Sequence, residues 1–496
     1  MRKSAKTAGG GGKTLSFLLA GLICLGAATA FADRTVSANY TLASDEDWSN
    51  DGIVTLAENI TIDLAGHTLI LTHLSASSGS GFTGTTGSAV VFAVDESASH
   101  TTLGEAEFID NIANLTLSGS AKILLVKNGS GGTLSATKMY LGDSHYAEFC
   151  QTNGAVSLTG ETSIIGRNSG SHGVYRMSGG TLDASKAFSV ASAGVGEFIQ
   201  TGGVARFTNW LNIGRNGGTG TYTVTGGVVT NMYNNNNNSP VYVGDEGGTG
   251  TLNVGGAATV KFYQLSMGGH NQASGKTNKG YLNVSGNGVF ETASWGTIGA
   301  KEYGYGEVNQ TGGKVTFGSE FSVGEYGTGI YNLTDGELTV GGMGLIVGRR
   351  PATTADGTFI QGAGRVTCAS LHVGSFYNNA PSTAGKNATG AYTQNGGMVV
   401  SSGNECIGWH GTGTYIQNGG TNRLSSSSSY LSLGEKPDSK STGVGRYVLN
   451  DGRLEVAGYI KVGKAGTATL EINGGEIAAS KIYSEGGTSS VLANGG

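Results

Sequence analysis

The chain is poor in proline, cysteine, charged residues and aromatic residues. Its 496 residues include 4 prolines and 4 cysteines, with 13% charged and 8% aromatic residues. So little proline excludes collagen, and so few cysteines exclude a disulfide framework. The 89 glycines argue against a helical protein, because each interior glycine costs a helix about 1 kcal/mol. Disordered linkers usually carry more charge and fewer β-branched residues. The remaining class is an all-β chain with frequent turns.

Residues 1–32 predict a secretory signal peptide. A start with four Lys or Arg residues precedes an apolar run over 15–27, and small residues follow that fit cleavage after Ala30 or Ala32. The apolar run is shorter than a membrane span requires. We therefore expect an exported protein, extracellular or at the cell surface, with no membrane span in the mature chain.

Removal of this leader makes the chain more acidic. Four basic and no acidic residues leave with it, so 26 basic residues face 35 acidic ones, a net charge of −9. No basic cluster remains, which argues against nucleic acid as a partner. The mature cysteines are Cys150, Cys368 and Cys406, and no C-x-x-C pattern occurs among them. Buried thiols are the simpler interpretation, and a bridge between Cys368 and Cys406 in neighbouring repeats is the alternative.

A repeat of about 23 residues covers most of the chain, a period typical of stacked repeat architectures. Each unit has an aromatic or aliphatic residue, an apolar residue or Gln two positions later, a glycine turn, and a closing Leu-x-Val-Gly strand. The spacing between units returns to 23 residues several times, as from Gly180 to Gly203, is 22 residues from Gly132 to Gly154, and otherwise lengthens by insertion. A fixed minimum with variable excess is typical of a solenoid. The last glycines of the turns mark fourteen units: Gly132, Gly154, Gly180, Gly203, Gly227, Gly256, a degenerate turn at 286–288, Gly313, Gly336, Gly364, Gly397, Gly420, Gly452 and Gly475.

The unit is built from strands. The residues five and three positions before each marker glycine share one face by period-two alternation. The pattern predicts an all-β, right-handed parallel β-helix (β-solenoid) of about fourteen coils over residues 128–496, roughly 65 to 70 Å long at about 4.8 Å per coil. Residues 33–127 are expected to form an N-terminal β cap and first irregular coils. The repeats stop inside a unit, which leaves two interpretations: a chain cut short, or a missing C-terminal translocator or anchor domain.

Glutamine recurs three positions before the marker glycine, as at Gln200, Gln394 and Gln417. These side chains could form an internal amide ladder, each bonding the coil above, or an exposed polar stripe. The same position also accepts Val, Leu and Met. That interchange favours the internal ladder.

The repeat units resemble a known group of proteins. Residues 121–136 (AKILLVKNGSGGTLSA), the G-x-G-x-Y-x-x-x-G-G units and residues 63–71 (DLAGHTLIL) are similar to bacterial autotransporter-associated β-strand repeat proteins and passenger-like β-helices. The resemblance covers roughly residues 50–490. It implies a secreted or cell-surface β-solenoid, often an adhesin or surface-layer component. We expect a non-catalytic adhesin or structural surface protein, and the alternative is a polysaccharide lyase or glycosidase.

No residue pattern favours an enzyme. A glycosidase needs two carboxylates about 5 to 9.5 Å apart, and here acids do not recur on adjacent coils. The eight histidines form no metal-ligand pair, so we expect no metal and no cofactor. Threonines do not stack regularly enough for an ice-binding ladder. Two acids are interpreted as turn residues and four as members of solvated corners: Asp335 and Asp451, then Asp245, Glu246, Glu302 and Glu325.

The candidate binding site is the corner that follows each closing glycine. This corner lengthens after Gly268, Gly348, Gly374 and Gly434, and insertions on one face of a solenoid often mark its binding face. Aromatic side chains with polar neighbours suit glycans or another surface protein as partners. The alternative is that corners simply tolerate insertions. The candidate binding residues are Tyr303, Tyr305, Arg349, Arg350, Phe376, Tyr377, Trp409 and His410.

Overall fold

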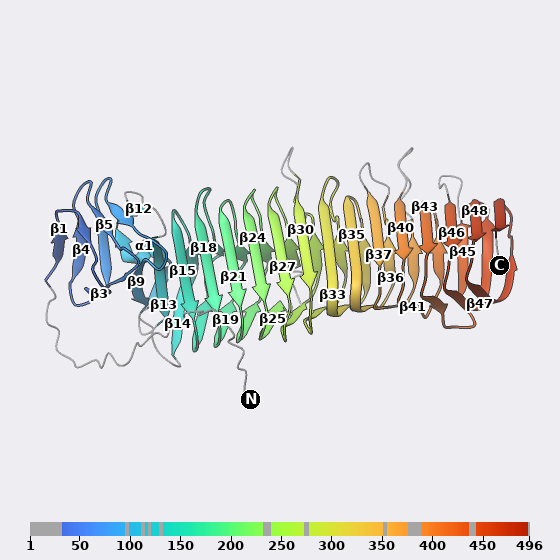
Figure 1. Cartoon of the computed structure of the whole chain (residues 1–496), viewed down its shortest axis with the longest axis horizontal. Helices are drawn as coiled ribbons and strands as arrows, with labels where there is room; N and C mark the ends of the chain where they lie inside the picture. Colours follow the sequence, from blue (N-terminus) through green and yellow to red (C-terminus); the bar gives the residue numbers. More distant parts are fainter. Residues whose placement is uncertain are drawn as a thin grey trace, which may run out of the picture.

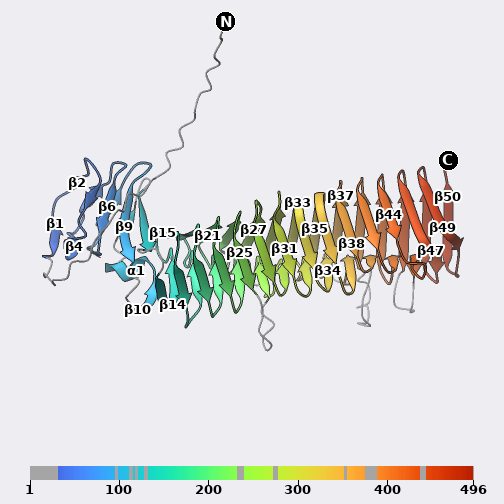
Figure 2. The ribbon, with the colours of Figure 1, turned by 90° about the horizontal axis from the view of Figure 1, so that it is seen from below.

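The computed structural model describes residues 32–94, 99–110, 115–117, 121–127, 132–231, 240–271, 277–350, 355–374, 388–435 and 443–494. In this part of the chain, strands pair in parallel, coil upon coil, along one rod (Figures 1 and 2). A regular coil has a six-residue, a four-residue and a three-residue strand, as in β24, β25 and β26. We name the three resulting sheets the long, middle and short faces. The predicted all-β parallel β-helix is confirmed, and residues 1–31 of the predicted leader lie outside the described part.

The long face runs almost the whole length of the rod. Eighteen of the described strands stack in it, each paired in parallel with the next. They are β3 (Glu46–Asp47), β6 (Thr68–Leu71), β9 (Ala89–Val94), β13 (Lys122–Lys127), β15 (Tyr146–Gln151), β18 (His172–Met177), β21 (Val195–Gln200), β24 (Thr219–Val224), β27 (Thr249–Val254), β30 (Lys279–Val284), β33 (Tyr305–Phe317), β35 (Thr328–Val340), β37 (Asp356–Gln361), β40 (Thr389–Gln394), β43 (Thr412–Gln417), β46 (Val444–Leu449), β48 (Thr467–Ile472) and β50 (Thr488–Ala493).

The middle and short faces follow in each coil, and five long strands (β14, β33, β35, β47, β49) each run without a break from one face to the next. The middle face contains β10 (Ser99–Leu103), β14 (Thr133–Leu141), β16 (Ala155–Leu158), β19 (Thr181–Ala184), β22 (Val204–Phe207), β25 (Val228–Asn231), β28 (Thr259–Phe262), β31 (Val289–Thr292), β38 (Arg365–Cys368), β41 (Met398–Ser401), β44 (Thr421–Leu424), β47 (Arg453–Lys464) and β49 (Glu476–Tyr483). The short face contains β17 (Ser163–Ile165), β20 (Phe188–Val190), β23 (Leu211–Ile213), β26 (Val241–Val243), β29 (Leu265–Met267), β32 (Gly296–Ile298), β34 (Glu320–Val323), β36 (Gly344–Val347), β39 (Leu371–Val373), β42 (Glu405–Ile407) and β45 (Tyr430–Glu435).

The N-terminal coils use the same parallel pairing with shorter strands. Their strands join the long face through β3 and β6 and form two further four-stranded sheets. The single helix of the described residues, α1 (Glu105–Phe108), lies where these coils meet the regular ones (Figure 1). The predicted division at residue 127 stays a prediction. The two further sheets are β1 (Arg34–Val36), β4 (Ile53–Leu56), β7 (His73–Ala76) and β11 (Ile109–Asp110), then β2 (Tyr40–Thr41), β5 (Thr61–Asp63), β8 (Gly81–Thr83) and β12 (Thr116–Leu117).

The core is one column of stacked side chains. On the long face the fourth and sixth strand positions point inward and are fully buried, as Tyr222 and Val224 are. Aromatic rings at the fourth position lie nearly parallel from coil to coil, with Tyr392 and Tyr415 centroids 4.7 Å apart at an angle of 3°. This spacing equals the distance between neighbouring strands in a sheet. Stacking of the coils therefore buries each aromatic ring against the next one.

The recurring glutamines are internal, as predicted, but their partners are not other amides. Gln394 is fully buried. Its Nε2 donates to the carbonyl oxygens of Gly397, 3.4 Å away, and Thr421 in the next coil, 3.1 Å away. Its Oε1 accepts a hydrogen bond from the hydroxyl of Tyr415, 2.8 Å away. The amide-to-amide ladder is therefore wrong, because the aromatic ring of the next coil carries the matching donor.

Amide ladders occur instead on the outer side of the long face. Asn283 donates to Asn253, 2.8 Å away, Asn309 donates to Asn283, 3.2 Å away, and Asn332 donates to Asn309, 2.9 Å away. On the middle face, opposite charges alternate along the coils, as in the pair formed by Lys314 and Glu337 at 3.1 Å. Exposed pairs of this kind contribute little singly. They do leave the outer surface with most of its charges neutralised by the neighbouring coil.

Glycine makes the corners possible. The predicted turn glycines have positive φ, as at Gly203 (72°) and Gly420 (74°). At the closing corner, Gly214 also has positive φ, and a Cβ there would lie 2.0 Å from the carbonyl oxygen of Thr249 in the next coil. The conformation and the space at Gly214 both favour glycine over a larger residue. Stacking of the coils therefore favours glycine here, and Ala191, which takes the equivalent place one coil earlier, adopts the same positive φ (68°).

The cysteines do not form a bridge. Cys150, Cys368 and Cys406 are free thiols, and the last two are buried. Cys368 occupies an inward position of the middle face, whereas Cys406 is the central residue of β42 on the short face. The alternative of a bridge between neighbouring repeats is therefore wrong, and the buried-thiol interpretation holds for these two residues.

Candidate functional site

The closing corner brings the described members of the predicted binding set to one edge of the rod but not into one site. Tyr303 is exposed and has a positive φ of 62°. Tyr305 begins β33 on the long face, and its ring packs 5.8 Å from that of Tyr281. Phe376 and Tyr377 lie outside the described residues. Whether this edge binds a ligand stays a prediction.

The two predicted arginines belong to an ion cluster. Arg349 is buried, and its guanidinium lies 2.5 Å from Glu320 and 3.5 Å from Glu325. It also donates to the hydroxyl of Ser322, 3.1 Å away. Arg350 pairs with Glu325 at 3.0 Å. The cluster ties two consecutive coils together, so both arginines already stabilise the fold in the absence of a ligand.

Trp409 and His410 lie at a different level of the same edge. The Trp409 ring packs 5.6 Å from that of His372, which is buried on the short face. Burial lowers the pKa of His372 to about 4, so this imidazole is neutral at physiological pH. The backbone N–H of His410 donates to the carbonyl oxygen of Glu435, 3.1 Å away. Trp409 and His410 therefore both make contacts within the solenoid itself.

The acids of the closing corner are less solvated than the sequence suggests. Asp245 is 4% exposed, and its Oδ1 accepts hydrogen bonds from the backbone N–H groups of His270 and Asn271, 2.9 and 2.8 Å away. The side chain of Glu325 is only 14% exposed. The interpretation as solvated corners is wrong for these two residues, because the next coil's corner folds over them. Asp335 does act as a turn residue, accepting the N–H of Gly336, 2.7 Å away.

Among the described residues, the pKa values of two enclosed carboxyl groups rise into the range expected of a general acid. Burial raises the pKa of Glu405 and of Glu105 to about 7. Glu405 points into the core, is fully buried, and accepts a hydrogen bond from Nδ2 of Asn422, 2.9 Å away. A group without access to solvent cannot transfer a proton to a substrate. The raised pKa of Glu405 thus results from its burial in the core and does not mark a catalytic group.

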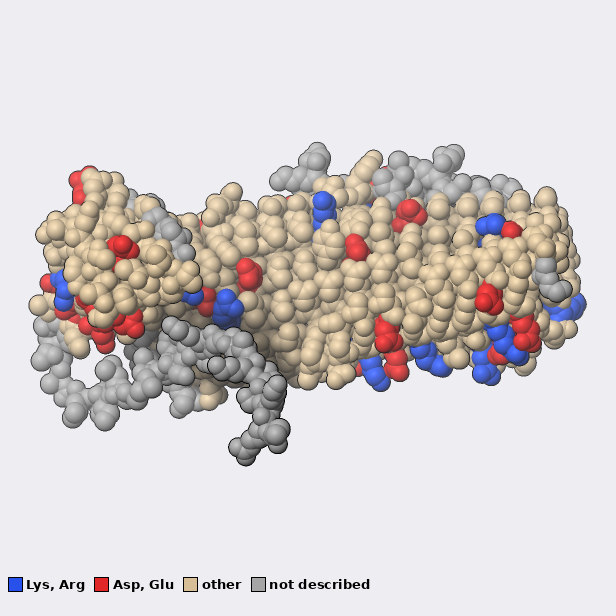
Figure 3. All heavy atoms as spheres, viewed as in Figure 1, with Lys and Arg blue, Asp and Glu red and all other residues tan. Residues whose placement is uncertain are grey.

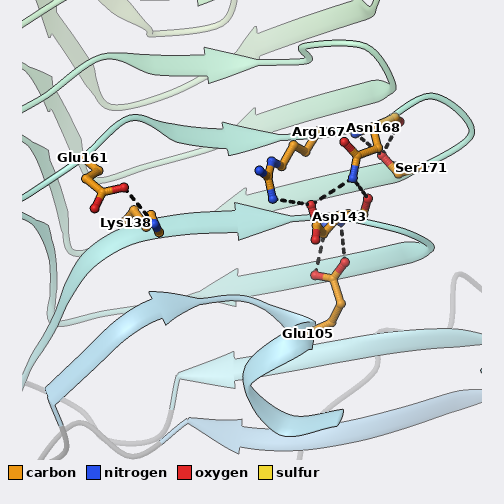
Figure 4. A network of polar contacts seen from close by, with 8 residues as sticks. Glu105, Lys138, Asp143, Glu161, Arg167, Asn168 and Ser171 are labelled. Carbon is orange, nitrogen blue, oxygen red and sulfur yellow. Dashed lines mark hydrogen bonds and ion pairs between the residues drawn. The ribbon is translucent and has the colours of Figure 1, made fainter. Parts of the chain in front are cut away.

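Glu105 anchors the junction between the N-terminal and the regular coils (Figure 4). It begins α1 and accepts a hydrogen bond from the backbone N–H of Asp143. The carboxylate of Asp143 pairs with Arg167 at 3.0 Å and also accepts from Nδ2 of Asn168, 3.2 Å away. The Arg167 guanidinium lies 4.1 Å from the centre of the Tyr140 ring. Every charged group of this network has a partner, which indicates a structural joint.

An open groove lies beside this joint, at the corner between the middle and short faces. Its volume is about 590 Å³, and its lining includes Tyr140, Glu161, Lys186, Asn209 and Trp210. We name it the Trp210 groove. Sequence reasoning missed it, because it examined only corners lengthened by insertion, and this corner is short. An available signal was the Asn-Trp pair directly before the closing Leu-x-Ile-Gly strand, where a large apolar side chain precedes the buried residues.

Other features provide no site. Among the described residues, no group of three or more His, Cys, Asp and Glu side chains is placed to hold a metal ion. No helix in that part of the chain is long and apolar enough to cross a membrane. On the face seen in Figure 3, charged side chains are sparse. Acidic side chains gather at the N-terminal end, and acidic and basic side chains mix along the lower edge towards the C-terminal end.

Neither a protein-family model, nor a curated protein, nor a solved structure matches this chain. The level of description that holds is therefore a long, all-parallel β-solenoid. The resemblance to autotransporter-associated repeats rests on the residues and motifs alone.

Proposed function

We propose that the chain is exported and acts at the cell surface as a passenger-like β-solenoid, a rigid and non-catalytic adhesin or structural protein. The observation that carries this proposal is the unbroken long face, which couples every coil from Glu46 to Ala493. At about 4.8 Å per step its eighteen strands extend roughly 80 Å. Such a rod keeps distant surface groups at fixed separations, which suits a spacer or an extended binding surface.

The non-catalytic part of the proposal is supported by the state of the carboxylates. Glu325 is held by Arg349 and Arg350, and Asp143 is held by Arg167. Glycoside hydrolysis needs two carboxylates that reach the same bond. Acids that are already neutralised by the neighbouring coil are poorly suited to that task.

Two further parts of the proposal are the location at the cell surface and the binding of glycans. They rest on the predicted signal peptide, on the resemblance of the repeats to autotransporter-associated repeats, and on the exposed aromatic residues of two corners. On the face that Figure 3 shows, basic side chains do not gather into a patch of the kind that favours nucleic acid. Glycans or another surface protein are therefore the proposed partners.

The test expresses the full chain in a bacterial host and follows export, then applies the mature chain, residues 33–496, to glycan-coated surfaces and to polysaccharides. We expect export, retention on the surface, and no release of reducing or unsaturated sugars. Replacement of Trp409 by Ala is expected to weaken retention if the closing corner is the adhesive edge. Turnover of any polysaccharide overturns the non-catalytic proposal, and retention in the cytoplasm overturns export.

A further inference from the structure

We infer that the Trp210 groove is a glycan-binding site in which a sugar ring stacks on the indole of Trp210. This inference rests on the proposed function, because it assigns the ligand class and the contact residues of a surface-bound binding rod. It places the main binding site at the corner between the middle and short faces. The sequence pattern had pointed instead to the closing corner.

The platform is exposed and rigid. Trp210 is 46% exposed, although most large apolar side chains of the described residues are buried. Its backbone N–H donates to Oδ1 of Asn209, 2.7 Å away, and its carbonyl oxygen accepts from the N–H of Phe188, 2.8 Å away. The indole ring packs edge-on against Tyr242, with centroids 6.4 Å apart. An aromatic ring fixed in this way loses little conformational entropy on binding, which favours affinity.

The groove runs along the rod axis. Glu161, Lys186 and Trp210 occupy the same corner in three consecutive coils, because the strands that follow them are in register. Tyr140 comes from the coil before, where it pairs with Ile164 of β17. Three coil steps separate Tyr140 from Trp210, a distance of about 14 Å. A groove of this length suits a chain of sugar rings better than a single small ligand.

Tyr140 forms the other end of the groove and is fixed by cations. The Arg167 guanidinium lies 4.1 Å from the centre of its ring, and Nζ of Lys138 lies 5.2 Å from it. These cation–π contacts hold the ring in one orientation. The two aromatic residues therefore bound the groove at fixed positions, and both are anchored by the fold itself.

The polar lining matches sugar hydroxyl groups. Glu161 is 57% exposed and pairs with Lys138 at 2.7 Å, which neutralises its charge while one carboxylate oxygen stays available as an acceptor. Lys186 and Asn209 supply donors, and Thr162 supplies a hydroxyl. An aromatic platform with a few fixed donors and acceptors is the usual composition of a small-molecule site of about 300 to 1,000 Å³. Lys186 has no ion pair among the described residues, so the groove accepts neutral sugars and also tolerates acidic ones.

The experiment measures binding of three probes to the mature chain: hexasaccharides of glucose, of N-acetylglucosamine and of galacturonic acid. Calorimetry gives the affinity, and tryptophan fluorescence reports on the ring. We expect at least one probe to bind, and Trp210→Ala to weaken that binding by roughly tenfold or more. Trp210→Phe should keep part of the affinity, because a smaller ring remains. If the probe is the galacturonic acid chain, Lys186→Ala should weaken it as well.

The matched control is Ile360→Ala. Ile360 is 38% exposed on the outer side of the long face, so the change removes an exposed apolar side chain away from the groove, and binding should not change. Unchanged binding in Trp210→Ala, or no binding of any probe at millimolar concentration, overturns the inference. The proposed function fails separately, through turnover or lack of export. Retention on cells that survives Trp210→Ala but not Trp409→Ala would move the site to the closing corner.

Discussion

Tyr392 donates its phenolic hydrogen to Oε1 of Gln361 in the preceding coil, across 2.8 Å in the centre of the core. Both side chains are fully buried. The same bond joins five other pairs, and in the described coils from β15 to β48 every inward Gln of the long face is followed by a Tyr. Some long-face strands have an apolar residue at the sixth position instead. The fourth position of the next strand then holds a side chain without a hydroxyl, as Phe198 after Met177 and Phe359 after Leu333. The five other pairs are Gln151–Tyr175, Gln200–Tyr222, Gln310–Tyr331, Gln394–Tyr415 and Gln417–Tyr447.

This pairing predicts strong coupling between Gln394 and Tyr415. Gln394→Leu leaves a buried hydroxyl without its acceptor, and Tyr415→Phe leaves a buried amide oxygen without its donor. Each change should lower the free energy of unfolding by about 1 to 3 kcal/mol. The double variant should lose clearly less than the sum, with a coupling of at least about 1 kcal/mol. The measurement is urea unfolding followed by circular dichroism.

The matched control is Phe359→Tyr, which adds a hydroxyl facing Leu333 instead of a glutamine. It should destabilise the chain, because the new buried donor has no acceptor at that level. Additive losses in the double variant at Gln394 and Tyr415 would contradict the pairing.

Glu405 predicts a loss of stability as the pH rises. Burial raises its pKa from 4.5 to about 7, so between these values the folded chain holds a proton that the unfolded chain has released. The free energy of unfolding should therefore fall between about pH 4.5 and 7 and then level off. Glu405→Gln should reduce this fall and raise the urea midpoint at pH 8. Glu105 acts in the same direction, so part of the pH dependence should remain.

Glu291→Gln provides the comparison for this measurement, because Glu291 lies on the outer side of the middle face and pairs with Lys261, 3.1 Å away. The fall in stability between pH 4.5 and 7 should remain in this variant, because Glu405 is unchanged. A parent profile that is flat from pH 4.5 to 7 would contradict the assignment to Glu405.

The closing corner predicts different outcomes for two glycine replacements. Gly214→Ala places a Cβ 2.0 Å from the Thr249 carbonyl oxygen at a φ of 72°, and should cost roughly 2 to 4 kcal/mol. Gly170→Ala has a similar φ of 83° but no atom within 4 Å of the new Cβ. It should cost only about 1 kcal/mol. The measurement is thermal unfolding. Equal losses of stability in the two variants would show that the positive φ, and not the contact with the next coil, makes glycine necessary at Gly214.

The thiols should be unreactive in the folded chain. Burial raises the pKa of Cys150 to about 12 and raises the pKa of Cys368 and Cys406 further. The thiolate is the reactive form. Titration of the mature chain with a disulfide reagent at pH 8 should find no fast thiol, and three after denaturation. A fast-reacting thiol in the native chain would contradict the raised pKa of these thiols.

The sequence predicts the architecture well because each coil repeats the same contacts. Glycine spacing and period-two alternation place Tyr415 and Gln417 on one inward face, as observed. The Gln–Tyr hydrogen bonds between coils were harder to predict from the sequence. They depend on a register in which the sixth residue of one long-face strand lies next to the fourth residue of the following one. Once that register is known, the correlation of Gln with the following Tyr can be read from the repeats.

Three residues show where sequence reasoning falls short and why. Glu405 stands where other units have Leu371 and Leu431, so its burial could have been predicted from the closing strand. Asp245 could not, because its burial depends on how the next coil's corner folds back. Trp210 was missed since exposure at a short corner leaves no periodic signal.

The Tyr–Gln bonds also set rules for how a gene of this kind can gain or lose units. Removing residues 395–417 would delete one whole coil and place Gln394 beneath Tyr447, which restores the native bond. Removing residues 311–333 deletes the same length but places Gln310 beneath Phe359, where its amide oxygen has no donor. Unequal crossing-over should therefore be tolerated at some unit boundaries and selected against at others. The rod can change length during evolution only in steps that preserve these interior partners.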